Sequence, residues 1–304
     1  MLQSLLVPLD GSEFSERTLG LAQGLAKATG ASLHLAHVHV PHPPDHFLSN
    51  TQFHYEGLDM EEYESRHRAE EEAYLKEVEA RLAGETAVDS VLLEGHVAEE
   101  VARYADDVGA DMILITTHGH TGVSRMWLGS VADALIRLTN MPMLVIHPAQ
   151  GGHVPADALS FKHVMVPLDG SELSATILGA AADVAKASGA KLTLVHVVSS
   201  SAVLGARIFP LLPDDVTPAL AKAREYLEAQ AGPLRAAGLS VDTHVEEHEA
   251  PGRAIAAVAD KLDADLIALA THGYGGLKRA LLGSVADKVL RSSPLPLLVQ
   301  RPEV

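Results

Sequence analysis

The stretch LLVPLDGSEFSERTLGLAQGLAKATGASLHLAHV, residues 5–38, predicts a strand, a helix and a second strand in succession. It begins with a short aliphatic run, and leucine and alanine then recur at helical spacing after a Gly-Ser pair. Gly30 follows this periodic segment and is expected to end the helix. A near copy, HVMVPLDGSELSATILGAAADVAKASGAKLTLVHV, begins at His163. The sequence therefore predicts the same β-α-β unit twice.

The repetition extends to the second part of each half. THGHTGVSRMWLGSVAD begins at Thr117 and THGYGGLKRALLGSVAD at Thr271, and the two agree at 11 of 17 positions. A stretch containing Gly151, Gly152 and Pro155 separates the two copies. We therefore expect two homologous domains, residues 1–149 and 160–304, joined by a linker over residues 150–159.

Each copy alternates strand-like with helix-like segments. In the first copy the further segments are an acidic helix within 59–82, a strand over 87–93, a helix over 97–108, a strand over 111–116, a helix over 130–138 and a strand over 141–148. Strands separated by helices form right-handed crossovers in a parallel sheet that helices cover on both faces. We predict a doubly wound α/β fold for each copy, with ligands bound at the carboxyl ends of the strands.

Composition excludes several classes of protein. Hydrophobic residues make up 47% of the chain and cysteine is absent, which excludes disulfides and a cysteine nucleophile. The net charge of −17 lies mostly in the first half and disfavours nucleic acid as a partner. No apolar run approaches the roughly 20 residues that span a bilayer. The first residues do not resemble a secretory signal, so we expect a cytoplasmic protein away from membranes.

The repeated glycine loop predicts an anion site. Gly119 and Gly122 allow positive φ angles that turn backbone N–H groups inward. Gly129 and Ser130 then begin a helix, whose first amides are unpaired and whose dipole favours an anion. The alternative is that Ser130 only caps this helix. Repetition of the loop beside a copied VPLDGS favours phosphate binding.

The loop lacks the lysine of a P-loop. No lysine precedes Ser130 or Ser284, as the motif G-x-x-x-x-G-K-[ST] requires. Arg125 and Arg279 are alternative phosphate partners, although a surface role fits them equally well.

Asp10 and Asp169 follow the first strand of each copy. Each carboxylate can accept a hydrogen bond from an adenine amino group or a ribose hydroxyl. Equally, an Asp before Gly-Ser can form the turn that starts the helix. From the spacing alone, both roles stay open.

The histidines do not predict a metal or a catalytic site. His34, His37, His39, His42 and His46 lie close together, but the second copy keeps only His196. No set of Asp, Glu and His recurs with ligand spacing. The repeated His118 and His272 have no serine or acid spaced to complete a triad.

Taken together, VPLDGS, a second strand ending in His-Val, THG-x9-GS and a closing P-x-LV strand resemble the universal stress protein family, in its tandem two-domain form. The resemblance covers almost all of both copies. It implies a five-stranded parallel sheet of order 3-2-1-4-5 in each copy. It also implies binding of an adenine nucleotide, ATP with or without Mg²⁺, as in members that carry G-x-x-G-x9-G-[ST].

The resemblance further implies which residues line each nucleotide site. In the first copy these are Pro8, Asp10, Val38, Ile115, Thr116, Gly119, Gly129, Ser130 and Val131. In the second copy they are Pro167, Asp169, Val197, Ala270, Gly273, Gly283, Ser284 and Val285. Thr116 and Ala270 replace the first glycine of the family motif. Because β-branched Thr116 restricts close approach of the backbone to phosphate, we predict that the second site binds nucleotide at least as well as the first.

Family members often dimerise through the last strand. In this chain, MPMLVIHP and LPLLVQRP are the strands that would meet, which makes the pairing intramolecular and leaves a further homodimer open. The leading interpretation is a nucleotide-binding stress-response protein with a regulatory or sensing role. The alternatives are a weak ATP hydrolase and a module that binds a protein partner without nucleotide.

Overall fold

A computed structural model describes residues 1–41, 60–84, 86–117, 128–147, 161–199, 217–272 and 282–303. The first copy comprises β1 (Ser4–Pro8), α1 (Glu13–Thr29), β2 (Ser32–His39), α2 (Met60–Leu82), β3 (Val88–Glu94), α3 (Val97–Asp107), β4 (Met112–Thr116), α4 (Ser130–Leu138) and β5 (Met143–Ile146). The second comprises β6 (His163–Pro167), α5 (Glu172–Ala175), α6 (Leu178–Ser188), β7 (Lys191–Val198), α8 (Thr217–Ala236), β8 (Val241–Glu247), α9 (Pro251–Lys261), β9 (Leu266–Ala270), α10 (Ser284–Ser292) and β10 (Leu297–Gln300). The predicted linker lies outside the described residues.

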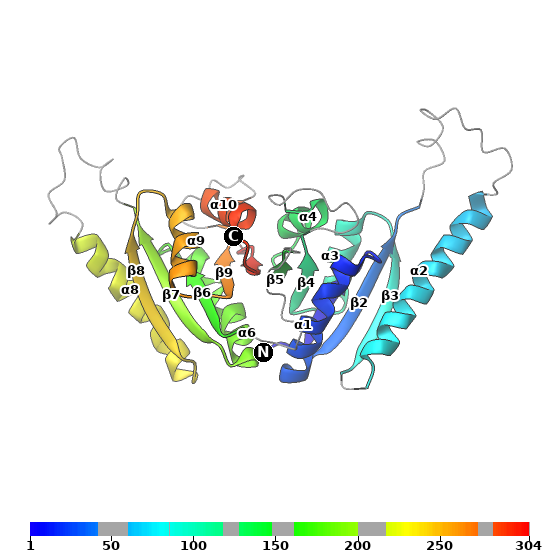
Figure 1. The fold of residues 1–304 in the computed structure, drawn as a ribbon, viewed down its shortest axis with the longest axis horizontal. Coiled ribbons are helices and arrows are strands. Elements are labelled where there is room, and N and C mark those ends of the chain that lie inside the picture. The colour runs from blue at the N-terminus through cyan, green and yellow to red at the C-terminus, as the bar shows by residue number, and fades with distance from the viewer. Residues whose placement is uncertain are drawn as a thin grey trace, which may run out of the picture.

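The predicted fold class is confirmed. Strands within each copy pair in parallel, and both copies have the order 3-2-1-4-5. In addition, β5 and β10 pair antiparallel, with Leu298 opposite Leu144, so that one sheet of ten strands runs through both copies. The copies lie side by side on the two sides of this seam (Figure 1).

The two faces of the sheet carry separate cores, and each core is shared by both copies. One core includes Leu25 of α1, Val184 of α6, and Leu144 and Leu298 of the seam. The other includes residues of α3, α4, α9 and α10. Each core continues across the β5–β10 pairing, so that apolar contacts run without interruption from one copy to the other. The stabilities of the two copies are therefore coupled.

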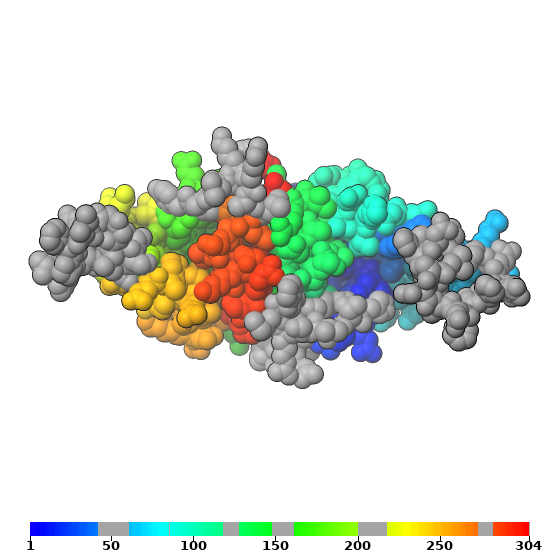
Figure 2. Space-filling model, turned by 90° about the horizontal axis from the view of Figure 1, so that it is seen from above, coloured from blue at the N-terminus to red at the C-terminus, as the bar shows by residue number. Residues whose placement is uncertain are grey.

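Contacts between the copies also occur outside the sheet. The amino group of Met1 lies 2.9 Å from the Asp183 carboxylate on α6. The Arg301 guanidinium donates a hydrogen bond to the backbone carbonyl of Arg137, at the end of α4. Seen from above, the red surface of the last helix lies against the green surface of the first copy (Figure 2).

Helix boundaries follow local signals. The Ser12 side chain caps α1 by accepting a hydrogen bond from the Ser15 N–H, and Gly30 ends the helix at φ 78°. In the second copy the equivalent helix is divided into α5 and α6. There the Thr176 hydroxyl donates to the Leu173 carbonyl at 2.8 Å, as the Thr18 hydroxyl donates to the Ser15 carbonyl at 2.6 Å within the undivided α1.

The acidic helix α2 is amphipathic, as its sequence predicts. Leu75, Val78 and Leu82 are buried against the sheet, while most of its charged residues are exposed. In the part of the chain that the structure describes, no helix is both long and apolar enough to cross a membrane.

Candidate functional site

The Asp-Gly-Ser turns have the same geometry in both copies. Asp10 Oδ1 accepts hydrogen bonds from the Ser12 N–H at 3.0 Å and from the Ser12 hydroxyl at 2.5 Å. Asp169 Oδ1 accepts the equivalent bonds from Ser171 at 3.0 and 2.6 Å. Of the two roles left open for these aspartates, the turn-forming one is therefore present. A carboxylate has several acceptor positions, so this turn is compatible with a ligand contact.

The helices that follow the two glycine loops, α4 and α10, are capped by glycine and not by serine. Gly283 is the N-cap, with φ −66° and ψ 145° and no side-chain hydrogen bond, and Ser284 is the first helical residue. Gly129 and Ser130 have the same positions at α4. The alternative that Ser130 serves only as an N-cap is wrong, because the glycine before it occupies that position. Both helices begin without a side-chain acceptor for their first amides.

Close packing explains Gly283. Its N–H donates to the Thr271 carbonyl at 2.7 Å, and the Thr271 N–H donates to the Gln300 carbonyl at 2.8 Å. A Cβ atom at Gly283 would lie 3.0 Å from the same Thr271 oxygen. Only glycine lets the start of α10 come this near the end of β9 without displacement.

A cavity of about 700 Å³ lies at the carboxyl ends of β6, β7 and β9. The starts of α9 and α10 close its other sides. Every residue predicted for the second site that the structure describes lines this cavity: Pro167, Asp169, Val197, Ala270, Gly283, Ser284 and Val285. The remaining one, Gly273, lies outside the described residues, as do Arg279 and most of the glycine loop.

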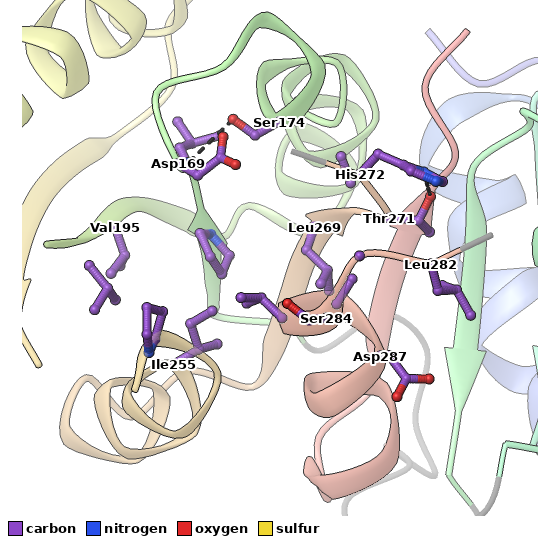
Figure 3. A pocket seen from close by; sticks show the side chains of 18 of the residues that line it. Asp169, Ser174, Val195, Ile255, Leu269, Thr271, His272, Leu282, Ser284 and Asp287 are labelled. Carbon is purple, nitrogen blue, oxygen red and sulfur yellow. Dashed lines mark hydrogen bonds between the residues drawn. The ribbon is translucent and has the colours of Figure 1, made fainter. Parts of the chain in front are cut away.

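Apolar and polar groups occupy different parts of this cavity. Val195, Ile255 and Leu269 supply apolar surface from two strands and a helix. Asp169 lies beside Ser174 at one side, and Ser284 lies at the start of α10 across from it (Figure 3). The cavity thus offers a hydrophobic wall, a carboxylate and the amino end of a helix to one ligand.

A partly buried histidine lies beside the segment that carries Asp169. Burial lowers the pKa of His196 below its usual value, against the opposing effects of the Asp169 charge and a hydrogen bond to the Leu168 backbone. The imidazole is therefore neutral near pH 7. We assign it a structural role in holding the segment after β6.

The first-copy residues occupy the corresponding strand ends and helix start. Pro8 ends β1, and Val38 lies near the end of β2. Ile115 and Thr116 end β4 and are buried. The other predicted members follow: Asp10 lies in the turn after β1, and Ser130 and Val131 begin α4 after Gly129. Gly119, Gly122, His118 and Arg125 lie outside the described residues.

Among the lining residues that the sequence analysis did not predict, one comes from the other copy. Arg137, in the last turn of α4, lines this cavity although it belongs to the first copy. Its Nε and Nη2 donate to the Asp133 carboxylate at 2.9 and 3.1 Å. A signal was present in the sequence, because the repeat continues past SVAD to an arginine in both copies, Arg137 and Arg291.

The first-copy histidines bind carboxylates. His39 contacts Glu71 at 2.7 Å through Nδ1 and Glu64 at 3.1 Å through Nε2, and His37 Nε2 lies 3.3 Å from Glu71. Among the residues that the structure describes, no group of three or more His, Asp or Glu could hold a metal ion. His42 and His46 are outside that part of the chain.

Comparisons with known proteins agree with this architecture. The universal stress protein family model matches residues 1–147 and 160–301. A universal stress protein of Methanocaldococcus jannaschii is 32% identical over 146 residues, which cover 46% of this chain and 81% of the relative. Another, from Mycobacterium tuberculosis, is 30% identical over 195 residues, which cover 62% of this chain and 61% of the relative.

Solved structures extend the likeness in fold to the whole chain. A universal stress protein from Archaeoglobus fulgidus superposes with a TM-score of 0.71 at 21% identity, covering 98% of both chains. A functionally unknown protein from Pseudomonas aeruginosa has a TM-score of 0.67 at 19% identity, covering 99% of this chain and 93% of the other. With the family model matched twice, this chain belongs to the universal stress protein family as a tandem of two domains.

Proposed function

We propose that this protein binds an adenine nucleotide, with ATP as the leading candidate, and acts as a cytoplasmic stress-response regulator or sensor. One observation carries the proposal. A single cavity combines apolar strand ends with a helix start whose cap is Gly283 and whose first residue is Ser284. This combination suits a ligand with a flat apolar base and an anionic tail.

Each part of the nucleotide has a suitable surface in the cavity. Pro167 and Val197 offer apolar contact to the base, and Asp169 offers an acceptor to the base or the ribose. The phosphates would meet the first amides of α10 and the Ser284 hydroxyl. A volume of about 700 Å³ falls within the range of small-molecule sites.

Hydrolysis is the weaker proposal because the carboxylates of this cavity have other partners. Asp169 accepts two hydrogen bonds from Ser171, and Asp287 pairs with Arg291 at 2.8 Å. Both carboxylates are already engaged by these groups, which disfavours either as a general base. ADP accumulating during incubation with ATP would favour the hydrolase instead.

The direct test is to denature freshly purified protein and to quantify each nucleotide released per chain. Calorimetric titration with ATP then compares the wild type with Ser284→Ala. Loss of a hydrogen bond to a charged group is expected to weaken binding about tenfold or more. Ser292→Ala, at the other end of α10, is the matched control and should bind normally, because its hydroxyl donates to the Lys288 carbonyl.

Two results would contradict the proposal. If the folded wild-type protein releases no nucleotide and gives no heat with added ATP, the cavity of the second copy does not bind ATP. Equal ATP affinity in Ser284→Ala and the wild type would show that the phosphates do not bind at the start of α10.

A further inference from the structure

We propose that the second nucleotide site is composite: Arg137, from the first copy, supplies a cationic contact to the anionic end of the ligand bound in the second copy. This inference rests on the proposed function, since it concerns the phosphate end of the same site. It adds a binding residue and a dependence of one domain on the other.

The position of Arg137 is the primary observation. Arg137 belongs to the last turn of α4, yet it lines the cavity together with Ser284, Val285 and Asp287 from the first turn of α10. The central contact between the two copies is visible from above (Figure 2). A cationic side chain therefore lies at the amino end of a helix, where the helix dipole is also positive. Two positive features converge there, and an anion is the ligand that satisfies both.

An intramolecular role accounts for only part of this arrangement. Arg137 pairs with Asp133 four residues earlier and lies in the last turn of α4, where cations are favourable. That pairing engages Nε and Nη2, and within the described part of the chain Nη1 donates no hydrogen bond, so it can serve another acceptor. The Arg137 side chain is 30% exposed. An arginine held by one carboxylate and open at its other edge is suited to a phosphate oxygen.

The contact between the copies holds Arg137 in place. The backbone carbonyl of Arg137 accepts a hydrogen bond from Arg301, which follows β10. The antiparallel pairing of β5 with β10 brings the end of α4 and the start of α10 together. Because the position is set by strand pairing, little conformational freedom is lost when a ligand binds.

The charges around the guanidinium support the same role. Its hydrogen bond to Asp133 is the largest effect that raises the pKa of Arg137, and the negative charge of Asp287 adds to it. Asp287 in turn pairs with Arg291 of its own helix. A phosphate entering here would meet Arg137, while the Asp287 carboxylate that also lines the cavity is already paired with Arg291.

The repeat extends the inference to the first copy. Arg291 pairs with Asp287 as Arg137 pairs with Asp133, and it occupies the equivalent place in the other repeat. We therefore expect Arg291 to serve the first site. Each domain would then contribute one arginine to the site of the other.

The test uses the full chain and two ligands, ATP and uncharged adenosine. Arg137→Ala should weaken ATP binding at the second site about tenfold or more. Adenosine affinity should stay unchanged, because the guanidinium contacts only the phosphates. Arg103→Ala is the control and should bind ATP as the wild type does, because this arginine of α3 pairs with Glu100 and Asp107 and does not line the cavity.

A second readout separates the two sites. In a Ser130→Ala background, which weakens the first site, calorimetry reports mainly the second site, and in a Ser284→Ala background it reports mainly the first. Arg137→Ala should weaken ATP binding in the Ser130→Ala background and leave it unchanged in the Ser284→Ala background, and Arg291→Ala should do the reverse.

The outcomes distinguish the two proposals. If the wild type binds ATP and Arg137→Ala binds it equally well, or if ATP and adenosine lose affinity equally, the composite site is refuted. If the wild type binds neither ligand, the proposed function itself fails.

Discussion

Substitution of Gly283 by alanine tests the packing that shapes the second site. The added Cβ would lie 3.0 Å from the Thr271 carbonyl oxygen, where ordinary van der Waals contacts start near 3.4 Å. The obstacle is backbone that also accepts the Gly283 N–H at 2.7 Å, so it cannot rotate away. We expect the start of α10 to shift by a few tenths of an ångström. Overpacking of this kind costs about 1–3 kcal/mol of unfolding free energy.

The assay combines urea denaturation with ATP titration. If the strain is relieved by displacing the first turn of α10, the amides that would meet phosphate move with it, and ATP affinity should fall about tenfold. Gly20→Ala is the matched control: Gly20 is an exposed residue of α1, and no atom lies within 4 Å of the place that the added methyl group would take. That change should stabilise the protein by about 0.5–1 kcal/mol.

The result that refutes this reasoning is specific. Gly283→Ala with unchanged unfolding free energy and unchanged ATP affinity would show that the contact to Thr271 relaxes without cost. Lower stability with normal affinity would show that the start of α10 is not where phosphate binds.

Three further predictions concern pH, the seam and the relation between the sites. Burial lowers the pKa of His163, so the unfolded chain binds its proton more readily, and unfolding free energy should fall as pH drops below about 6.5. His163→Gln should flatten this dependence in urea titrations between pH 7 and 5, and an unchanged slope would contradict the assignment. Leu298→Ala should cost about 2–5 kcal/mol and destabilise both copies together, because this leucine belongs to a core that they share. Two separate unfolding transitions, with only one of them shifted, would oppose that view. Finally, the second site should bind ATP at least as tightly as the first, so Ser284→Ala should lose no less total binding than Ser130→Ala in calorimetry. A greater loss of ATP binding in Ser130→Ala than in Ser284→Ala would contradict this prediction.

Local signals explain why so much of the fold is predictable. An aliphatic run, a Gly-Ser pair before the helix and a glycine after it predict each β-α-β unit. In the structure, Gly30 and Gly189 end their helices in the left-handed conformation. The division of α5 from α6 was not predicted, because hydrophobic periodicity does not report where the backbone hydrogen bonding of a helix is interrupted. The alternative of Ser130 as the cap of α4 was one position away from the observed cap, Gly129, since glycine and serine are both favourable caps.

The sequence by itself determined the two copies, the alternation of strands and helices, and the residue types that line the cavity. These depend on periodicity and turn chemistry within a few residues. The family resemblance led us to expect the two last strands to meet, and in the structure β5 and β10 pair antiparallel. Tertiary structure alone decided that the copies share their cores and that Arg137 lines the cavity of the other domain. Such contacts join residues far apart in the chain. They depend on strand pairing and helix packing across the seam, which no local pattern encodes.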